Sequence, residues 1–156
     1  MLYELGDWDA SRSWLKQIHR SREISPDIHA RAFLLSGDIA RKQSGKNWKA
    51  CYRKAIDLFS RQRNKSHRDV YRIASLYKQI QRFEDSERWF KKLVKRRGEL
   101  GDELASGVYF HLGDIYFRDK REKGKAKRCF LKTLELNPGH RKAGEYLAEI
   151  EELSHE

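Results

Sequence analysis

Two cysteines and six histidines are the side chains in this sequence best suited to metal, redox or nucleophilic chemistry. A metal site needs such residues at short, regular spacing, for example two histidines one helical turn apart. No two histidines stand four residues apart, and none lies beside a cysteine motif. We therefore expect neither a metal site nor another cofactor.

Acidic side chains gather where Glu84, Asp85 and Glu87 follow one another closely. They stand at the expected start of a helix, where carboxylates cap free N–H groups and favour the helix dipole. No glycine-rich phosphate loop follows a predicted strand, and no nucleophile, base and orienting group come together. The sequence therefore predicts no catalytic residues and a protein that is not an enzyme.

The composition favours a helical protein with a thin core. The chain has 156 residues, enough for one domain or one short repeat array, and 38% of them are hydrophobic. Ten glycines and two prolines are too few for an all-β domain with many turns. No apolar run approaches the roughly 20 residues of a membrane-spanning helix, and the N-terminus lacks the layout of a signal peptide. We expect a cytoplasmic protein without a membrane span.

Apolar spacing, turn residues and caps predict eight helices and therefore an all-α fold. Pro26 suits a first helical turn, and Pro138 ends one helix and precedes the next. Apolar residues recur at helical rather than strand spacing. The expected helices cover residues 8–21, 27–43, 46–63, 67–80, 84–97, 102–118, 122–136 and 139–153.

Small and large residues alternate between these helices in a recurring code. A small residue lets two helices approach closely, and a large side chain fills the hole that remains between them. The first helices supply the small residues Gly37, Ala74 and Gly113, and the second helices supply the small residues Ser11, Ser86 and Ala126 and the large residues Leu15, Tyr52, Phe90 and Phe130.

This code resembles the tetratricopeptide repeat, as do Leu112, Tyr116 and Pro138 around the last copy. The resemblance implies an α-solenoid of antiparallel helix pairs, with about three and a half repeats and a C-terminal capping helix. The large residues lie 37, 38 and 40 positions apart, against about 34 in the standard unit, which indicates a long-repeat variant similar to kinesin light chain arrays. An extra residue is expected in the inner turn of the last repeat, between Arg118 and Ala126. An ordinary helical bundle with chance small residues is the alternative.

We expect one array over residues 1–156. Its first repeat supplies little more than a second helix, so the open end would expose Leu2, Leu5 and Trp8. This end predicts that the chain is a fragment of a longer protein, or that two copies pair there as a homo-oligomer. The expected parts are the second helix of repeat one at 6–22, repeat two at 27–64, repeat three at 67–97, repeat four at 102–137 and the capping helix at 139–153.

Cys51 and Cys129 hold equivalent positions two repeats apart, each directly before a large aromatic residue. Helices pack about 8–10 Å apart, so these residues should be on the order of 20 Å apart. A disulfide requires Cα atoms within about 7 Å. We therefore expect no disulfide and interpret both thiols as small packing residues.

By resemblance, the first helices line a concave groove that binds a protein or peptide partner. Basic residues outnumber acidic ones there, so we expect a partner with acidic and apolar side chains, although a merely solvated face is the alternative. Arg68 and Arg72 resemble one basic pair of the chaperone-tail binders in this family, but Asp38 and Leu35 replace the required asparagines, so we do not expect that ligand. The candidate groove residues are Arg31, Leu34, Asp38, Arg41, Arg68, Tyr71, Arg72, Lys78, Phe110, Asp114, Phe117 and Arg118.

A second basic region lies on the second helices and turns, in segments 88–97 and 118–132. It offers an alternative function, the binding of nucleic acid or an anionic surface by counterion release. No RNA-binding signature accompanies it, and a solvated face is the favoured interpretation. A purely structural or oligomerisation role in a larger protein is the third possibility. The candidate carriers of this basic edge are Lys91, Lys92, Lys95, Arg96, Arg97, Lys123, Lys125 and Lys127.

Overall fold

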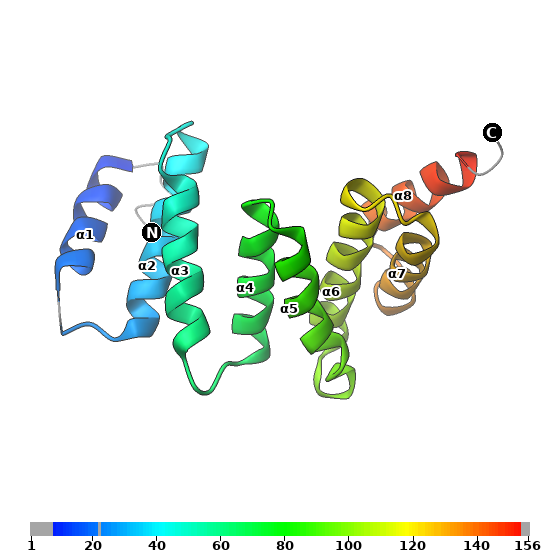
Figure 1. Cartoon of the computed structure of the whole chain (residues 1–156), viewed down its shortest axis with the longest axis horizontal. Coiled ribbons are helices and arrows are strands. Elements are labelled where there is room, and N and C mark those ends of the chain that lie inside the picture. The colour runs from blue at the N-terminus through cyan, green and yellow to red at the C-terminus, as the bar shows by residue number, and fades with distance from the viewer. Residues whose placement is uncertain (1–7, 22, 154–156) are drawn as a thin grey trace. The chain divides into compact units, whose positions relative to one another are not determined.

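A computed structural model describes residues 8–21 and 23–153 of the chain (Figure 1). Within these ranges the regular elements are all helical, which confirms the predicted all-α fold. None of the described helices is long and apolar enough to span a bilayer. The elements are α1 (Trp8–Arg20), α2 (Pro26–Lys42), α3 (Trp48–Arg61), α4 (His67–Gln79), α5 (Phe83–Val94), the 3-10 turn η1 (Arg97–Glu99), α6 (Asp102–Asp114), the π-helical turn η2 (Ile115–Asp119), α7 (Lys123–Leu136) and α8 (Arg141–Glu152).

The chain divides into two compact units, one up to Lys65 and one from Ser66 onward. The first unit holds α1 to α3, and the second holds α4 to α8. The division falls between the expected repeats two and three. Leu2, Leu5 and the side chain of Trp8, which the sequence places at an open end, lie outside the described part of the chain.

Local sequence explains where α2 and α4 begin, each of which is the first helix of a helix pair. Ser25 caps α2 by accepting a hydrogen bond from the backbone N–H of Ile28, and Pro26 occupies the first helical position. Ser66 caps α4 through a reciprocal capping box with Asp69. These caps supply acceptors for N–H groups that no helical carbonyl reaches, so both helix starts are encoded locally.

The inner turns of the three complete helix pairs share a backbone feature. Ser44, Gln81 and Arg121 each adopt a left-handed conformation, with φ angles of 54°, 65° and 54°. Non-glycine residues rarely adopt this conformation, because Cβ crowds the backbone there. Its recurrence after α2, after α4 and after η2 shows that the three pairs turn back in the same way.

The small–large code packs each helix pair as the sequence predicts. A Cβ atom added to Gly113 would stand 2.6 Å from Phe130 Cε1, and one added to Gly37 would stand 2.5 Å from Tyr52 Cδ1. Both rings are fully buried. In the middle pair the buried hydroxyl of Ser86 donates a 2.8 Å hydrogen bond to the Ala74 carbonyl. The glycines are therefore needed for close approach between paired helices.

The extra residue of the last repeat does not lie in the inner turn where the sequence analysis put it. It is absorbed in η2, where the Lys120 N–H donates to the Ile115 carbonyl five residues back, at 3.1 Å. Such a π turn fits one more residue into a helix than the α pattern holds. The sequence analysis expected this residue between Arg118 and Ala126, a range that overlaps only the end of η2.

A half-buried carboxylate on α5 holds this π turn in place. Glu87 accepts hydrogen bonds from the Tyr116 hydroxyl at 2.8 Å and from Lys120 Nζ at 2.6 Å, and Lys91 Nζ lies at 2.6 Å. Burial alone would raise the pKa of the Glu87 carboxyl, but the bonds from Lys120, Lys91 and Tyr116 lower it to about 2. Since Tyr116 lies in η2 and Lys120 directly follows it, both ends of the turn are tied to α5.

Cys51 and Cys129 are both free thiols. Burial raises the pKa of Cys129 to about 11, and burial also raises the pKa of Cys51. A thiol with a raised pKa is a poor nucleophile at neutral pH. Both residues therefore behave as packing residues.

Candidate functional site

In the first unit, the four candidate groove residues share one face of α2. Arg31, Leu34, Asp38 and Arg41 recur at three- and four-residue spacing. Arg31 is exposed and pairs with Asp27 across one turn, with 2.8 Å between Nε and Oδ2. Leu34 is half-buried and Arg41 is exposed. This face therefore combines basic groups with one apolar side chain.

In the second unit, α4 carries four further candidates. Arg68 is exposed, whereas Tyr71, Arg72 and Lys78 are half-buried. Arg72 is held by Asp69, with 3.0 Å between Nη1 and Oδ1. The cations of α4 thus differ in availability, and Arg68 is the most accessible of them.

The last four candidates come from α6 and η2. Asp114 is buried, and Arg118 is exposed. Phe110 and Phe117 are half-buried, because their rings pack near Tyr146 of α8, with centroid distances of 6.1 and 5.7 Å. The capping helix therefore covers part of the apolar surface that the sequence assigned to the partner.

A cavity of about 510 Å³ lies between α4 and α6. It brings together three of the predicted site residues, Lys78, Asp114 and Arg118, which the chain contributes from two neighbouring first helices and the π turn. The remaining lining residues are Ser75, Gln79, Gln81, Phe83, His111 and Asp119.

Charge in this cavity is largely compensated within the protein. Lys78 Nζ forms a close ion pair with Asp114 Oδ2 and lies 3.2 Å from Nδ1 of His111. Arg118 Nε lies 3.7 Å from Asp114 Oδ1. Burial, followed by the charge of Lys78, lowers the pKa of His111 to about 4, so its ring is neutral at pH 7 and Nδ1 accepts from Lys78.

A smaller cavity of about 300 Å³ lies nearer the start of the same two helices. Arg68 and Tyr71 of α4 line it together with Glu103 and Leu104 of α6. Between the two cavities the Tyr71 ring contacts the His111 ring, with 5.6 Å between centroids. The α4–α6 surface therefore offers two hollows separated by an aromatic contact.

The candidate list from the sequence omitted several residues of the larger cavity, among them Gln79, His111 and Asp119. A usable signal existed for Gln79 because it follows the candidate Arg72 by seven residues and so shares its helix face. Asp119 was not predictable, since the π turn that directs it into the cavity has no sequence signature here.

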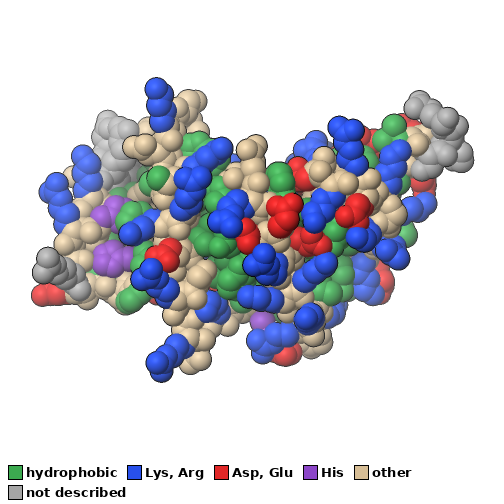
Figure 2. All heavy atoms as spheres, viewed as in Figure 1, with side chains coloured by type: hydrophobic (Ala, Val, Ile, Leu, Met, Phe, Trp, Pro, Cys, Tyr) green, Lys and Arg blue, Asp and Glu red, His purple; other side chains and the backbone are tan. Residues whose placement is uncertain are grey.

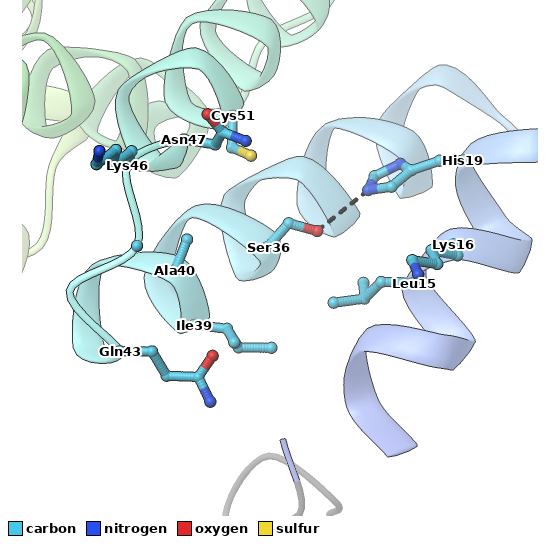
Figure 3. Close-up of a pocket in the computed structure, with 11 residues that line it drawn as sticks. Leu15, Lys16, His19, Ser36, Ile39, Ala40, Gln43, Lys46, Asn47 and Cys51 are labelled. Atoms are coloured by element: carbon cyan, nitrogen blue, oxygen red, sulfur yellow. Dashed lines mark hydrogen bonds between the residues drawn. The ribbon is translucent and has the colours of Figure 1, made fainter. Parts of the chain in front are cut away.

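The first unit has a cavity of its own, of about 400 Å³, between α1, α2 and the start of α3 (Figure 3). Leu15 and Ile39 give it apolar walls, and Cys51 lies at its α3 side. His19 Nε2 lies 3.1 Å from the Ser36 hydroxyl and joins α1 to α2. No residue of this cavity was predicted as a site residue.

Most candidates of the basic edge have partners within the chain. Lys127 Nζ lies 2.9 Å from Glu151 Oε1, and Lys92 Nζ lies 3.6 Å from the centre of the Trp89 ring. Figure 2 shows acidic side chains interspersed among the basic ones on the face in view. Further pairs are Lys91 with Glu87, Arg96 with Glu99, Arg97 with Asp102, Lys123 with the Leu153 carbonyl and Lys125 with Glu122.

In the described ranges, no group of three or more His, Cys, Asp or Glu side chains is arranged to hold a metal ion.

Comparison with known proteins supports the repeat fold. Residues 70–99 and 106–140 match the model of the tetratricopeptide repeat family. Among solved structures, the first such repeat domain of Spaghetti (RPAP3), bound to the HSP90 peptide SRMEEVD, is 19% identical with a TM-score of 0.61, covering 87% of this chain and all of that one. MamA is 18% identical with a TM-score of 0.67, covering 99% and 82%. MamA from Desulfovibrio magneticus RS-1 is 16% identical with a TM-score of 0.68, covering 99% and 80%.

The comparison with curated protein sequences gave a different outcome. No curated protein sequence matches this chain significantly.

Proposed function

We propose that this chain, which matches the tetratricopeptide repeat family over residues 70–99 and 106–140, is a non-enzymatic protein–protein interaction module. Its ligand is a peptide or an extended segment of a partner protein. The observation that carries the proposal is the α4–α6 surface, where two cavities lie side by side along two first helices.

The spacing of the two cavities suits an extended chain. Arg68 and Tyr71 line one cavity, and Ser75 and Lys78 line the other, about seven residues further along α4. At 1.5 Å per residue this separation is about 10 Å, which an extended peptide covers in about three residues. A bound segment can therefore place one side chain in each cavity.

The chemistry at the Arg68 end favours an acidic group with apolar neighbours. Arg68 is exposed beside Tyr71 and Leu104, so a carboxylate can pair with its guanidinium while apolar atoms cover the ring. The peptide in the RPAP3 structure, SRMEEVD, is acidic in this sense, and that structure has the same fold as this chain. Arg31, Leu34, Asp38 and Arg41 extend the proposal to the α2 face of the first unit.

A peptide-selection experiment tests this proposal. Random peptides displayed on phage are selected against the wild-type chain, and the enriched peptides are then measured against Arg68→Glu/Arg72→Glu. We expect at least about tenfold weaker binding, because reversed charge repels the acidic anchor. Arg53→Glu/Lys54→Glu is the matched control, since both residues are exposed on α3 and the charge change is the same.

Two results would contradict the proposal. One is that the wild-type chain enriches no peptide. The other is that both double variants bind the selected peptides equally well, while circular dichroism shows that both are folded.

A further inference from the structure

The larger cavity between α4 and α6 contains buried polar atoms without hydrogen-bond partners. Asp114 Oδ1, Gln79 Oε1 and Ser75 Oγ are all buried; the first two have no hydrogen-bond partner in the described structure, whereas Ser75 interacts with the Tyr71 hydroxyl. All three residues line this one cavity. Two of the atoms are acceptors only, and the hydroxyl can accept as well. Buried polar groups are normally paired, and the unsatisfied atoms of this cavity are acceptors, which a donor from a ligand could satisfy.

The first unit shows why one oxygen of Asp114 accepts no hydrogen bond. Asp38 follows Gly37 as Asp114 follows Gly113. Asp38 Oδ1 accepts a 2.5 Å hydrogen bond from the hydroxyl of Tyr52, the ring that packs on Gly37. The ring that packs on Gly113 belongs to a phenylalanine, Phe130, and has no hydroxyl to donate.

The basic groups of the cavity leave this oxygen open. Lys78 binds the other carboxylate oxygen of Asp114 and also Nδ1 of His111. Arg118 Nε lies 3.7 Å from Asp114 Oδ1, beyond hydrogen-bond distance, and its guanidinium lies 5.5 Å from the centre of the Tyr146 ring. A carboxylate ligand would have to compete with Asp114 for Lys78, whereas a donor can bind the open oxygen directly.

The charges around the cavity also favour a cation. Asp119 is exposed, yet partial desolvation and then the nearby charge of Asp114 raise its pKa, with Glu84 adding to the effect. Two of these carboxylates, Asp114 and Asp119, line the cavity together with two cations, Lys78 and Arg118, and Glu84 adds a third negative charge near Asp119. An additional positive charge would balance the set, and neutral His111 would not repel it.

We propose that the cavity between α4 and α6 receives a lysine or arginine side chain of the partner, which donates to Asp114 Oδ1. This inference rests on the proposed peptide-binding function and adds a basic anchor to the acidic one at Arg68. Gln79 Oε1 and Ser75 Oγ provide further acceptors for its remaining N–H groups. The partner segment therefore carries opposite charges about three residues apart, in keeping with the spacing of the two cavities.

Small probes test this subsite without any peptide. Nα-acetyl-arginine methylamide and Nα-acetyl-glutamate methylamide are titrated separately into ¹⁵N-labelled chain, and amide shifts are followed by NMR. We expect the arginine probe to give saturable shifts at residues lining the cavity, such as Gln79 and His111. The glutamate probe should give no saturable shifts there.

Phe130→Tyr is the decisive variant, because it can give Asp114 the internal donor that Asp38 already has. We expect it to bind the arginine probe about tenfold more weakly, because a charge-assisted hydrogen bond to Asp114 is lost. Asp114→Asn should weaken binding in the same direction and serves as the second variant if the added hydroxyl perturbs folding. Tyr52→Phe, in the first unit, is the matched control and should leave binding unchanged.

The inference is overturned if the arginine probe gives no saturable shifts, if the glutamate probe binds as tightly, or if folded Phe130→Tyr and Asp114→Asn both bind like the wild type. These outcomes leave the peptide-selection result untouched. Conversely, a chain that binds the arginine probe but enriches no peptide disproves the proposed function and retains the cation subsite.

Discussion

The pair Gly37–Asp38 in the first unit and the pair Gly113–Asp114 in the second have the same local architecture and different consequences. In each, a glycine lets an aromatic ring of the next helix lie against the backbone, and an aspartate follows it. Tyr52 satisfies its aspartate, whereas Phe130 leaves an oxygen of Asp114 open. One hydroxyl group therefore distinguishes an aspartate oxygen that is hydrogen-bonded within its unit from one that is not.

The largest effect is expected from filling the space that both glycines leave. Gly37→Ala and Gly113→Ala would each place a methyl group against a buried ring, closer than real Cβ contacts allow. We expect each to destabilise its own unit by about 3 kcal/mol, as overpacking does when the neighbour cannot move. Amide hydrogen exchange measures this unit by unit, and each substitution should accelerate exchange in one unit only.

Gly144→Ala provides the control for that pair. Nothing lies within 4 Å of a Cβ added there, at the end of the first turn of α8. It should be neutral or stabilising by up to about 1 kcal/mol, because alanine is the better helix former. If Gly144→Ala destabilised the chain as much as the other two, close packing at the glycines would not be the cause.

Acid should weaken the second unit through His111. Its folded pKa of about 4 lies below its ordinary 6.5, because burial and Lys78 disfavour the charged ring. The unfolded chain therefore binds the proton more readily, and the stability from neutral His111 is complete above pH 6.5 and lost as pH falls towards 4. The loss is about 3 kcal/mol at most. Urea midpoints measured at pH 7 and pH 4.5 test it.

The first unit provides an internal reference for this pH dependence. Burial, and then His29, also lower the pKa of His19, so both units lose stability in the same direction. His111→Asn should reduce the pH dependence in the second unit and leave that of the first unchanged. Equal pH dependence of the second unit with and without His111 would contradict the assignment.

Removing the Tyr52 hydroxyl, which has no counterpart on Phe130, should have a moderate effect on the stability of the first unit. Tyr52→Phe leaves Asp38 without its 2.5 Å hydrogen bond, in a partly buried setting. We expect a loss of about 1–2 kcal/mol from the first unit. Chemical denaturation followed by circular dichroism measures it. An unchanged midpoint would show that water replaces the tyrosine hydroxyl at no cost.

The smallest effect is expected at the basic edge. Lys123→Glu/Lys125→Glu/Lys127→Glu should change the affinity for a random oligonucleotide little, because these side chains already bind acceptors within the chain. Fluorescence anisotropy at increasing salt measures it. Strong binding to the wild type that falls steeply with salt and vanishes in the triple variant would favour the nucleic-acid alternative.

The packing code could be predicted from sequence because it depends on side-chain size. Gly37, Ala74 and Gly113 need only be small, and Tyr52 and Phe90 need only be large, for the helix pairs to close as they do. Size is a property of the residue itself. The repeat and its helices therefore followed from residue types and spacing.

The candidate site was only partly predictable, because its properties depend on which side chains meet. A count of charges treats Lys78 and Asp114 as independent groups. In the structure they form an ion pair, so neither charge is fully available to a ligand of opposite charge. The open oxygen of Asp114 depends on the ring opposite, and the difference between Tyr52 and Phe130 was visible in the sequence. The π turn that brings Asp119 into the cavity left no such trace.

That π turn also shows how a helical repeat can change what it recognises without rebuilding its core. One residue added to a helix rotates every later side chain by about 100° about the axis. Here Glu87 fixes Tyr116 and Lys120 on either side of the rotation, so the hydrophobic contacts stay in register. Among repeats of this kind, insertions and deletions inside the first helix would then be a source of new ligand preferences, alongside point substitutions.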